Sequence, residues 1–284
     1  MKTLIALLFI SGFSLSCFAA CPSADLNGDC RVDLADMAML ASEWLVNGVQ
    51  EPDIAWTQQI NDPGVSGQGG FYGYMSKYET TNAQFTQYLN AALAAGEITV
   101  SGNYVAGISG PYSGQHYCNL PGGGYTFNGA TSGGASRINW TGSTFTVDPG
   151  FENHPVTYVS WYGATAFADF YGWRLPTEGE WQAMADFNGA YTHGCGTTIN
   201  TSIANFINSS HPYGTTPVGT FGTYGYGVSD MSGNVWEWTS SVIGSQRILR
   251  GGAWYDSSDS TRVSFWFGFA PDSTYYGFGF RVCR

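Results

Sequence analysis

Charged side chains are scarce in this chain of 284 residues, where they make up 11% of the sequence. Basic residues are especially few, 10 Lys and Arg against 21 Asp and Glu, which gives a formal net charge of −11 at pH 7. A surface of this sign lacks the cations that neutralise phosphates, so it argues against nucleic acid as a partner. The same charge suits cation binding or simple solubility.

Long apolar runs are also lacking, apart from the start of the chain. Residues 1–20 combine Lys2, an apolar stretch over residues 4–15 and a pair of small residues, a pattern typical of a secretory leader. The stretch is too short to span a bilayer as a helix, and no other segment is long and apolar enough. We therefore expect an exported protein (extracellular, periplasmic or cell-surface) with no transmembrane segment. Lipid attachment at Cys21 is the alternative to free secretion, although Phe18 fits a lipobox poorly.

Several metal-binding and catalytic signatures are missing. The sequence has no Cys-x-x-Cys pair for zinc or redox chemistry, no His-x₃-His spacing and no nucleophile elbow. An exported chain can form disulfides. The cysteines after the leader are Cys21, Cys30, Cys118, Cys195 and Cys283. One hypothesis pairs Cys21 with Cys30, and another pairs Cys195 and Cys283 with each other or with Cys118.

Glycine and aromatic residues are abundant instead: 39 Gly, 18 Tyr, 18 Phe and 10 Trp. This composition favours a loop-rich fold held by aromatic packing. Three segments have helical signals among the short strands. The first is capped by Thr80 or Thr81, the second is capped by Ser160 and ends at Gly172, and the third has a capping box of Thr177 and Glu180. The predicted buried face of the first helix contains Phe85, Tyr88, Leu89, Ala92 and Leu93. We expect an α+β domain.

Residues 25–36, DLNGDCRVDLAD, have the spacing of a calcium loop. Its predicted oxygen donors at loop positions 1, 3, 5, 7, 9 and 12 are Asp25, Asn27, Asp29, Arg31 (through its carbonyl), Asp33 and Asp36. The stretch resembles one repeat of a type I dockerin, with Cys30 where glycine usually makes the turn. Dockerins carry two repeats and this chain has one, so support for a cohesin partner is weak. The alternative is an Asp- and Asn-rich turn that caps a helix.

Five motifs follow a polar linker at residues 47–53: KYETTNAQF, HPVTYVSWYGATAFADFYGWRLPTEGEW, SDMSGNVWEWTSS, ILRGGAW and GFGFRV. In this order they resemble the formylglycine-generating enzyme (sulfatase-modifying factor) family. The resemblance covers residues 54–284 and implies a loop-rich variant of the C-type-lectin fold. The expected organisation is a leader at 1–20, a dockerin-like segment at 21–48 and this domain at 54–284.

The same resemblance implies structural calcium. The ligands of the first site would be the Asp230 side chain, the Gly233 and Val235 carbonyls and the Glu237 carboxylate. The alternative for Glu237 is a salt bridge with Arg250 or Arg281. A second family site would use Asn205 and the Phe206 carbonyl, but no acidic residue stands near Ser210, where another ligand is expected.

The family's oxidase chemistry uses copper held by two cysteines after an Arg-Gly-Gly motif. Counted from Arg250, the matching positions hold Asp256 and Thr261, which are hard oxygen donors and cannot replace a pair of soft thiolates. The resemblance therefore implies that copper is not bound and that oxidase activity is lost. Asp256 and Asp259 are expected to be solvated rather than a catalytic pair.

Two functions remain open. The first is a calcium-stabilised binding or surface-assembly module for a peptide, protein or glycan, with aromatic side chains after residue 253 as contacts. These aromatics also suit a core, which we favour for Trp266 and Phe267. The second is a divergent formylglycine-generating oxidase, or another oxidoreductase on the same scaffold.

Overall fold

The computed structural model contains two compact units, residues 1–51 and 52–284. The structure describes residues 32–33, 50–65, 69–122, 126–127, 130–131, 136–207, 209 and 214–284. The predicted leader, Cys21, Cys30 and all calcium-loop donors except the exposed Asp33 lie outside these ranges. Within them, no helix has both the length and the apolar character that a membrane crossing requires.

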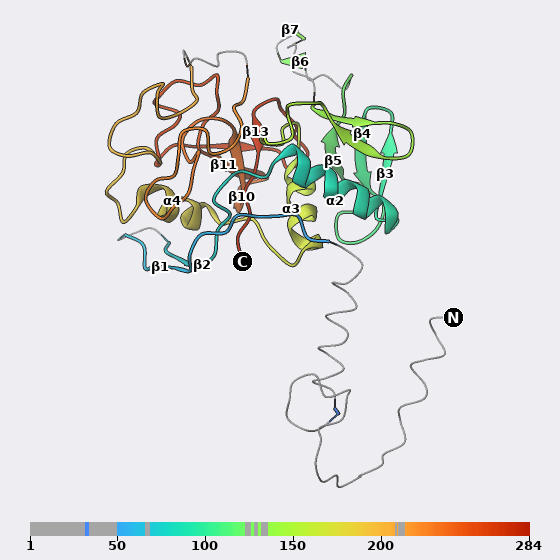
Figure 1. The fold of residues 1–284 in the computed structure, drawn as a ribbon, viewed down its shortest axis with the longest axis horizontal. Coiled ribbons are helices and arrows are strands. Elements are labelled where there is room, and N and C mark those ends of the chain that lie inside the picture. Colours follow the sequence, from blue (N-terminus) through green and yellow to red (C-terminus); the bar gives the residue numbers. More distant parts are fainter. Residues whose placement is uncertain are drawn as a thin grey trace. The chain divides into compact units, whose positions relative to one another are not determined.

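The first half of the second unit consists of short antiparallel pairings around one long helix (Figure 1). Strands β1 and β2 pair with each other, β3, β4 and β5 form a three-stranded sheet, and β6–β7 and β8–β9 are hairpins. The bounds are β1 (Ile60–Asp62), β2 (Phe71–Gly73), α2 (Asn82–Ala94), β3 (Ile98–Ser101), β4 (Tyr104–Gly107), β5 (His116–Asn119), β6 (Thr126–Phe127), β7 (Ala130–Thr131), β8 (Ile138–Trp140) and β9 (Phe145–Val147).

The second half supplies two helices and a four-stranded sheet in the order β12-β11-β10-β13. Strands β10, β11 and β12 are antiparallel neighbours, whereas β13 lies parallel to β10. The strand β12 is therefore an edge of this sheet. The bounds are α3 (Trp161–Phe170), α4 (Glu178–Asp186), β10 (Trp236–Ile243), β11 (Gln246–Arg250), β12 (Trp266–Phe269) and β13 (Phe278–Gly279).

The three helices that the structure describes begin where the sequence predicts. Thr81 caps α2 through a capping box with Gln84, and Ser160 caps α3. Thr177 and Glu180 form the predicted capping box of α4, and Arg174 holds the Glu180 carboxylate through bonds of 2.7 and 2.8 Å. Local hydrogen bonding therefore fixes each helix start without long-range contacts.

Aromatic packing joins the helices to the sheet, as the composition predicts. Phe85 of α2 stacks on Phe167 of α3 with ring centroids 5.9 Å apart, and Phe280 packs against both rings. Of the predicted face of α2, Phe85, Tyr88, Leu89 and Ala92 are buried, whereas Leu93 is half-buried. A second core cluster surrounds Trp181 of α4 and includes Phe71, Met75, Met184, Met231 and Cys283. The α+β, loop-rich architecture is confirmed.

Candidate functional site

The segment from Asp230 to Trp238 turns tightly before it enters β10. Asp230, Gly233 and Asn234 all have positive φ, at 59°, 88° and 65°. A Cβ atom at Gly233 would lie 2.2 Å from the carbonyl oxygen of Asn205, so this close approach requires glycine. The turn delivers Glu237, which is completely buried, into the centre of the domain.

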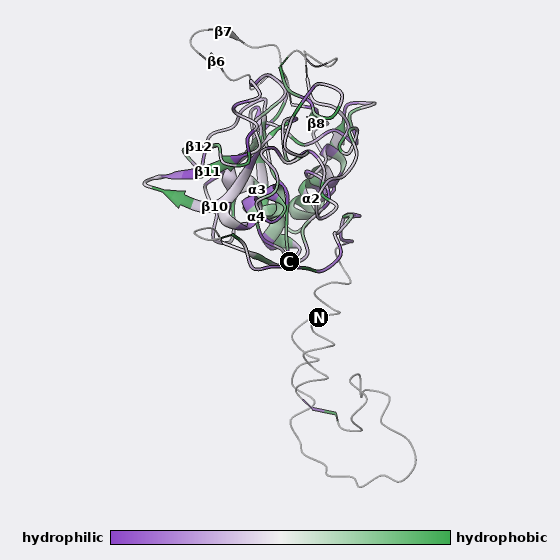
Figure 2. Ribbon diagram, turned by 90° about the vertical axis from the view of Figure 1, so that its left-hand side faces the viewer, coloured by the Kyte–Doolittle hydropathy of each residue, from purple (hydrophilic) through white to green (hydrophobic). Residues whose placement is uncertain are grey.

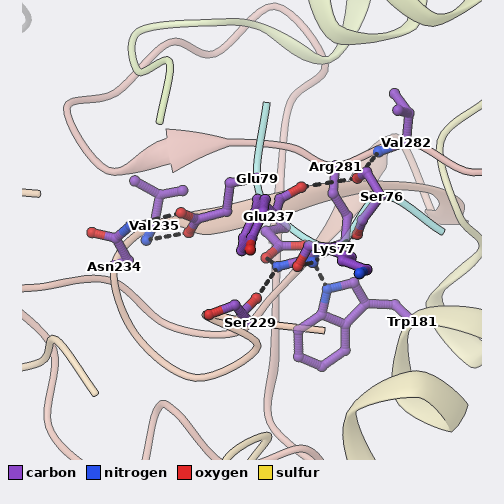
Figure 3. Close-up of polar contacts among 11 residues, drawn as sticks. Ser76, Lys77, Glu79, Trp181, Ser229, Asn234, Val235, Glu237, Arg281 and Val282 are labelled. Carbon is purple, nitrogen blue, oxygen red and sulfur yellow. Dashed lines mark hydrogen bonds and ion pairs between the residues drawn. The ribbon is translucent and has the colours of Figure 1, made fainter. Parts of the chain in front are cut away.

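The Glu237 carboxylate pairs with the buried guanidinium of Arg281 (Figure 3). Arg281 donates from Nε to Oε2 over 2.6 Å and from Nη2 to Oε1 over 2.7 Å, and Trp181 Nε1 donates to Oε2 over 2.7 Å. Arg281 also donates to the carbonyls of Ser76, Lys77 and Ser229. Of the two arginines considered from the sequence, Arg281 is the partner, because Arg250 instead binds Glu178 and Gln182 of α4.

Three buried carboxyl groups surround this single guanidinium, so ionisation of all three would leave an excess of negative charge. Glu79 and Asp230 join Glu237, and burial raises the pKa of Glu79 well above its usual value, with the charges of the other two as further causes. Burial also raises the pKa of Asp230 to about 6, although the Gly219 amide donates to its carboxylate over 2.7 Å. A bound cation would relieve this repulsion.

Glu79 is a site residue that the sequence reasoning missed. Its carboxylate accepts hydrogen bonds from Asn234 Nδ2 at 2.6 Å and from the Val235 amide at 3.1 Å, so it holds the turn that carries the predicted ligands. The available signal was its place in the KYETT motif, two residues before Thr81, the cap of α2. Nothing local in that motif indicates that its carboxylate reaches a turn some 150 residues later.

The donors predicted for the first calcium site are of the type that calcium prefers, although no three acidic, histidine or cysteine side chains among the described residues are arranged to hold a metal. Asp230 offers a buried carboxylate, and among the described residues Glu237 Oε1 accepts one hydrogen bond, from Arg281, which leaves it a lone pair for a metal. The Gly233 and Val235 carbonyls lie on the same turn. In this arrangement Arg281 and calcium would share the carboxylate, so a salt bridge does not by itself exclude a metal ligand.

The residues of the second predicted site satisfy one another. Asn205 Oδ1 accepts from the Ser209 hydroxyl at 2.7 Å, Asn205 Nδ2 donates to the Gly214 carbonyl, and the Phe206 carbonyl accepts from the Ser209 amide. These contacts bring no carboxylate to Asn205 and Phe206, so the donors lack the negative charge that favours calcium. This second site stays a prediction.

The two positions that correspond to the oxidase cysteines both have structural partners. Asp256 Oδ2 accepts hydrogen bonds from Trp236 Nε1 at 2.7 Å and from the Ala253 amide at 2.9 Å. Thr261 is buried, and its hydroxyl donates to the Ser258 carbonyl at 2.9 Å. Both side chains therefore stabilise the loop after Arg250, and neither supplies sulfur.

Burial disfavours the thiolate form of the cysteines in the described part of the chain. Cys118, Cys195 and Cys283 are free, so the disulfides hypothesised among them are wrong. Burial raises the pKa of Cys195 to about 11 and that of Cys283 to about 12, and it raises the pKa of Cys118 further. A thiolate is the form that binds copper and attacks electrophiles, so the raised pKa values disfavour both reactions at neutral pH.

The aromatic side chains of β12 lie at the surface, contrary to the core position favoured from the sequence. Trp266 is 44% exposed and Phe267 is 47% exposed, and on its outer side their strand pairs with no other described strand. Val242 and Ile243, at the apolar end of β10 (Figure 2), are also exposed, and Ile243 lies against Gly268 of β12. We call Val242, Ile243, Trp266 and Phe267 the apolar strip. The strand register places Val242 and Phe267 on one face of this sheet edge and Ile243 and Trp266 on the other.

The apolar strip connects to the loop after Arg250 through Trp236. The Trp236 ring lies 6.2 Å from that of Phe267, and its Nε1 holds Asp256. Next to Asp256, a group of rings packs closely, with Tyr255 4.7 Å from Tyr276. Trp236 thus links Phe267 of the apolar strip to the loop that contains Asp256.

Comparison with known proteins identifies relatives of this domain. The profile of the sulfatase-modifying factor enzyme 1-like domain matches residues 70–284. The chain is 31% identical over 193 residues to the formylglycine-generating enzyme of Mycobacterium tuberculosis, an alignment that covers 59% of this chain and 62% of that protein. It is 34% identical over 148 residues to the inactive C-alpha-formylglycine-generating enzyme 2 of Bos taurus, covering 45% of this chain and 49% of that protein.

A further relative and two solved structures extend the comparison. The chain is 34% identical over 171 residues to the serine/threonine-protein kinase pkn1 of Chlamydia caviae, which is 52% of this chain and only 27% of that protein. The structure of CarF aligns with a TM-score of 0.55 at 22% identity, covering 83% of this chain and 99% of CarF. PvdO from Pseudomonas aeruginosa aligns with a TM-score of 0.50 at 18% identity, covering 82% of this chain and 92% of PvdO. These two likenesses concern the fold alone.

Proposed function

We propose a binding role for this chain, which belongs to the family of sulfatase-modifying factor enzyme 1-like domains. In this role it is an exported module, stabilised by calcium, that has no oxidase activity. The observation that carries the proposal is the pair Asp256 and Thr261, which stand where the family resemblance places the copper-binding cysteines and are hydrogen-bonded into the loop. A relative that is named an inactive enzyme supports the same reading.

The apolar strip is the binding surface, and its partner is an extended peptide segment with apolar side chains. As an edge strand, β12 offers backbone groups that another strand can pair with. The exposed Trp266 and Phe267 can anchor apolar side chains, as aromatic residues do at the centre of interfaces. The net charge of −11 favours a basic peptide over an acidic one.

We expect no turnover when the full chain is incubated with a Cys-x-Pro-x-Arg sulfatase peptide, Cu(I) and dioxygen. The reason is that the described thiols are protonated at neutral pH and the loop after Arg250 contains no cysteine. Mass spectrometry of the peptide measures the loss of mass that accompanies conversion of its cysteine to formylglycine. The M. tuberculosis relative serves as the positive control, and a comparable mass loss with this chain would refute the proposal.

A peptide library displayed on phage is expected to yield binders that depend on the apolar strip. Replacing Trp266 by Ser should weaken the selected peptides by roughly tenfold or more, because loss of an aromatic anchor typically costs about 2 kcal/mol. The matched control is Tyr72→Ser, another exposed aromatic residue on β2, which should leave binding unchanged. The site assignment is wrong if both variants bind alike, or if a glycan array yields ligands and the peptide library yields none.

A further inference from the structure

The backbone of β12 has hydrogen-bonding groups that its own sheet does not use. The strand pairs with β11 over the residues Trp266–Phe269 and lies at the edge of the described sheet. In an antiparallel pair only alternate residues exchange hydrogen bonds, so the amides and carbonyls of the other residues point away from β11. Among the described residues, no residue of β12 forms a backbone hydrogen bond outside the sheet. This edge can therefore accept a further strand.

Other contacts fix the two ends of this edge. Before β12, Arg250 Nη1 donates to the carbonyls of Val263 at 2.6 Å and Phe265 at 3.0 Å. After β12, the Ala270 carbonyl accepts a hydrogen bond from the Ser273 amide at 3.0 Å, where the chain turns. The residues between these anchors are held in an extended conformation before any partner arrives, which lowers the entropic cost of binding.

Both faces of the edge present apolar side chains. Phe267 shares one face with Phe269, and their ring centroids lie 5.3 Å apart. Trp266 points to the opposite face, because successive residues of a strand alternate between faces. On that face Ile243 covers Gly268, where a Cβ atom would come within 3.4 Å of the Ile243 side chain. A strand that pairs with β12 therefore meets apolar surface on both of its sides.

The charges near this edge favour a basic partner. Asp272 is exposed shortly after β12 and forms no ion pair with another described residue. The two arginines of β11 are engaged elsewhere, since Arg250 binds Gln182 of α4 and Arg247 stacks 3.6 Å above the Trp161 ring. With the net charge of −11, this arrangement favours a lysine or arginine next to the apolar residues of the partner.

We propose that β12 binds an extended segment whose apolar residues stand at consecutive positions, with a basic residue beside them. The inference rests on the proposed binding function of the apolar strip. A partner residue opposite Phe267 points to the face of Phe267, and the next partner residue points to the face of Trp266. A segment that alternates apolar and polar residues would place polar side chains against one of these exposed rings.

This sequence pattern also defines the kind of segment that is available. In folded proteins, continuous apolar runs belong to strands that are buried on both faces, so they cannot reach another protein. The partner of β12 is therefore an unstructured terminus or linker that becomes a strand on binding. Such a segment loses conformational freedom when it binds, and the fixed ends of β12 keep the additional cost on this side small.

Two synthetic peptides of the same composition test the order of residues on the unmodified full chain. One has its valine and phenylalanine residues in a run, the other alternates them with serine, and both end in a pair of lysines. The run should bind roughly fivefold more tightly, because it gains apolar cross-strand pairs on both faces. Isothermal titration calorimetry measures both affinities. Equal affinities, or a preference for the alternating peptide, would overturn the inference and leave a peptide-binding function in place; if neither peptide binds, both fail.

Amide hydrogen exchange followed by NMR tests whether the run peptide pairs as a strand. In the free chain, alternate amides of Trp266–Phe269 should exchange quickly, because no hydrogen bond protects them. The bound peptide should slow their exchange by roughly tenfold or more. The amide of Gly163, which donates to the Ser160 hydroxyl, should not change. Binding that leaves the exchange of β12 unchanged would show contact through side chains alone and would overturn the inference.

Variants at the two exposed rings assign peptide positions to faces. In the parent chain, a single serine placed at any position of the run should weaken binding roughly two- to fivefold. Phe267→Ser should remove this penalty at every second position, and Trp266→Ser should remove it at the positions between. The matched control, Tyr72→Ser, should retain the penalty at all positions, since Tyr72 is an exposed aromatic residue of β2. If both ring variants relax the same positions, recognition on two faces is wrong.

Discussion

Replacing Arg281 by Met is expected to lower the free energy of unfolding by about 3–5 kcal/mol, because it leaves a buried charge without its partner. Arg281 is completely buried and donates two hydrogen bonds to Glu237 and three to backbone carbonyls. Methionine fills similar volume but satisfies none of these acceptors. Urea unfolding followed by tryptophan fluorescence measures the loss, since Trp181 contacts the same carboxylate.

The matched control for Arg281 is Arg262→Met, which removes an exposed pair with Asp259. Arg262 and Asp259 are 48% and 78% exposed, so this change should cost at most about 1 kcal/mol. A double variant, Arg281→Met with Glu237→Leu, should be less destabilised than Arg281→Met alone, because the orphaned charge is removed as well. If Arg281→Met lowers the free energy of unfolding no more than Arg262→Met does, the buried ion pair between Arg281 and Glu237 does not stabilise this domain.

Local signals made the helices predictable from the sequence. A capping box needs residues only three positions apart, so Thr177 and Glu180 fix the start of α4 whatever the rest of the chain does. The cap of α3 at Ser160 and the buried face of α2 follow from similarly short spacings. Composition alone indicates a core built from aromatic side chains, so this type of packing was predictable. Which individual rings contact one another was not.

Contacts between distant parts of the chain determine the features that could not be predicted from the sequence. Glu237 had two candidate arginines, and only the parallel placement of β13 beside β10 brings Arg281 to it. Trp266 and Phe267 have the composition of a core strand, but β12 ends the sheet and exposes them. Glu79 and Asn234 meet across 155 positions of sequence, a distance at which residue spacing carries no information.

Removal of calcium is expected to lower the melting temperature by roughly 5–10 °C. A single site at calcium 100-fold above its Kd adds about 2.7 kcal/mol, and 1 kcal/mol shifts a domain of this size by about 2–4 °C. The physical reason is the excess of carboxylates: Glu79, Asp230 and Glu237 surround one guanidinium, and burial raises the pKa of Glu79 and Asp230. Thermal unfolding in EDTA and in excess Ca²⁺ measures the shift.

The variant Asp230→Asn assigns that shift to the site that contains Glu237. Asparagine retains an oxygen for the Gly219 amide, so the fold keeps this contact while the cation loses one charged ligand. The variant should lose much of the calcium-dependent shift, and in EDTA it should melt at or above the parent, because the repulsion with Glu79 is gone. Asp259→Asn, in which the lost carboxylate is exposed, should behave as the parent does. The calcium site is refuted if the melting temperature is the same in EDTA and in calcium and metal analysis finds no bound calcium. Arg281 and retained protons would then offset the negative charge of the three carboxylates.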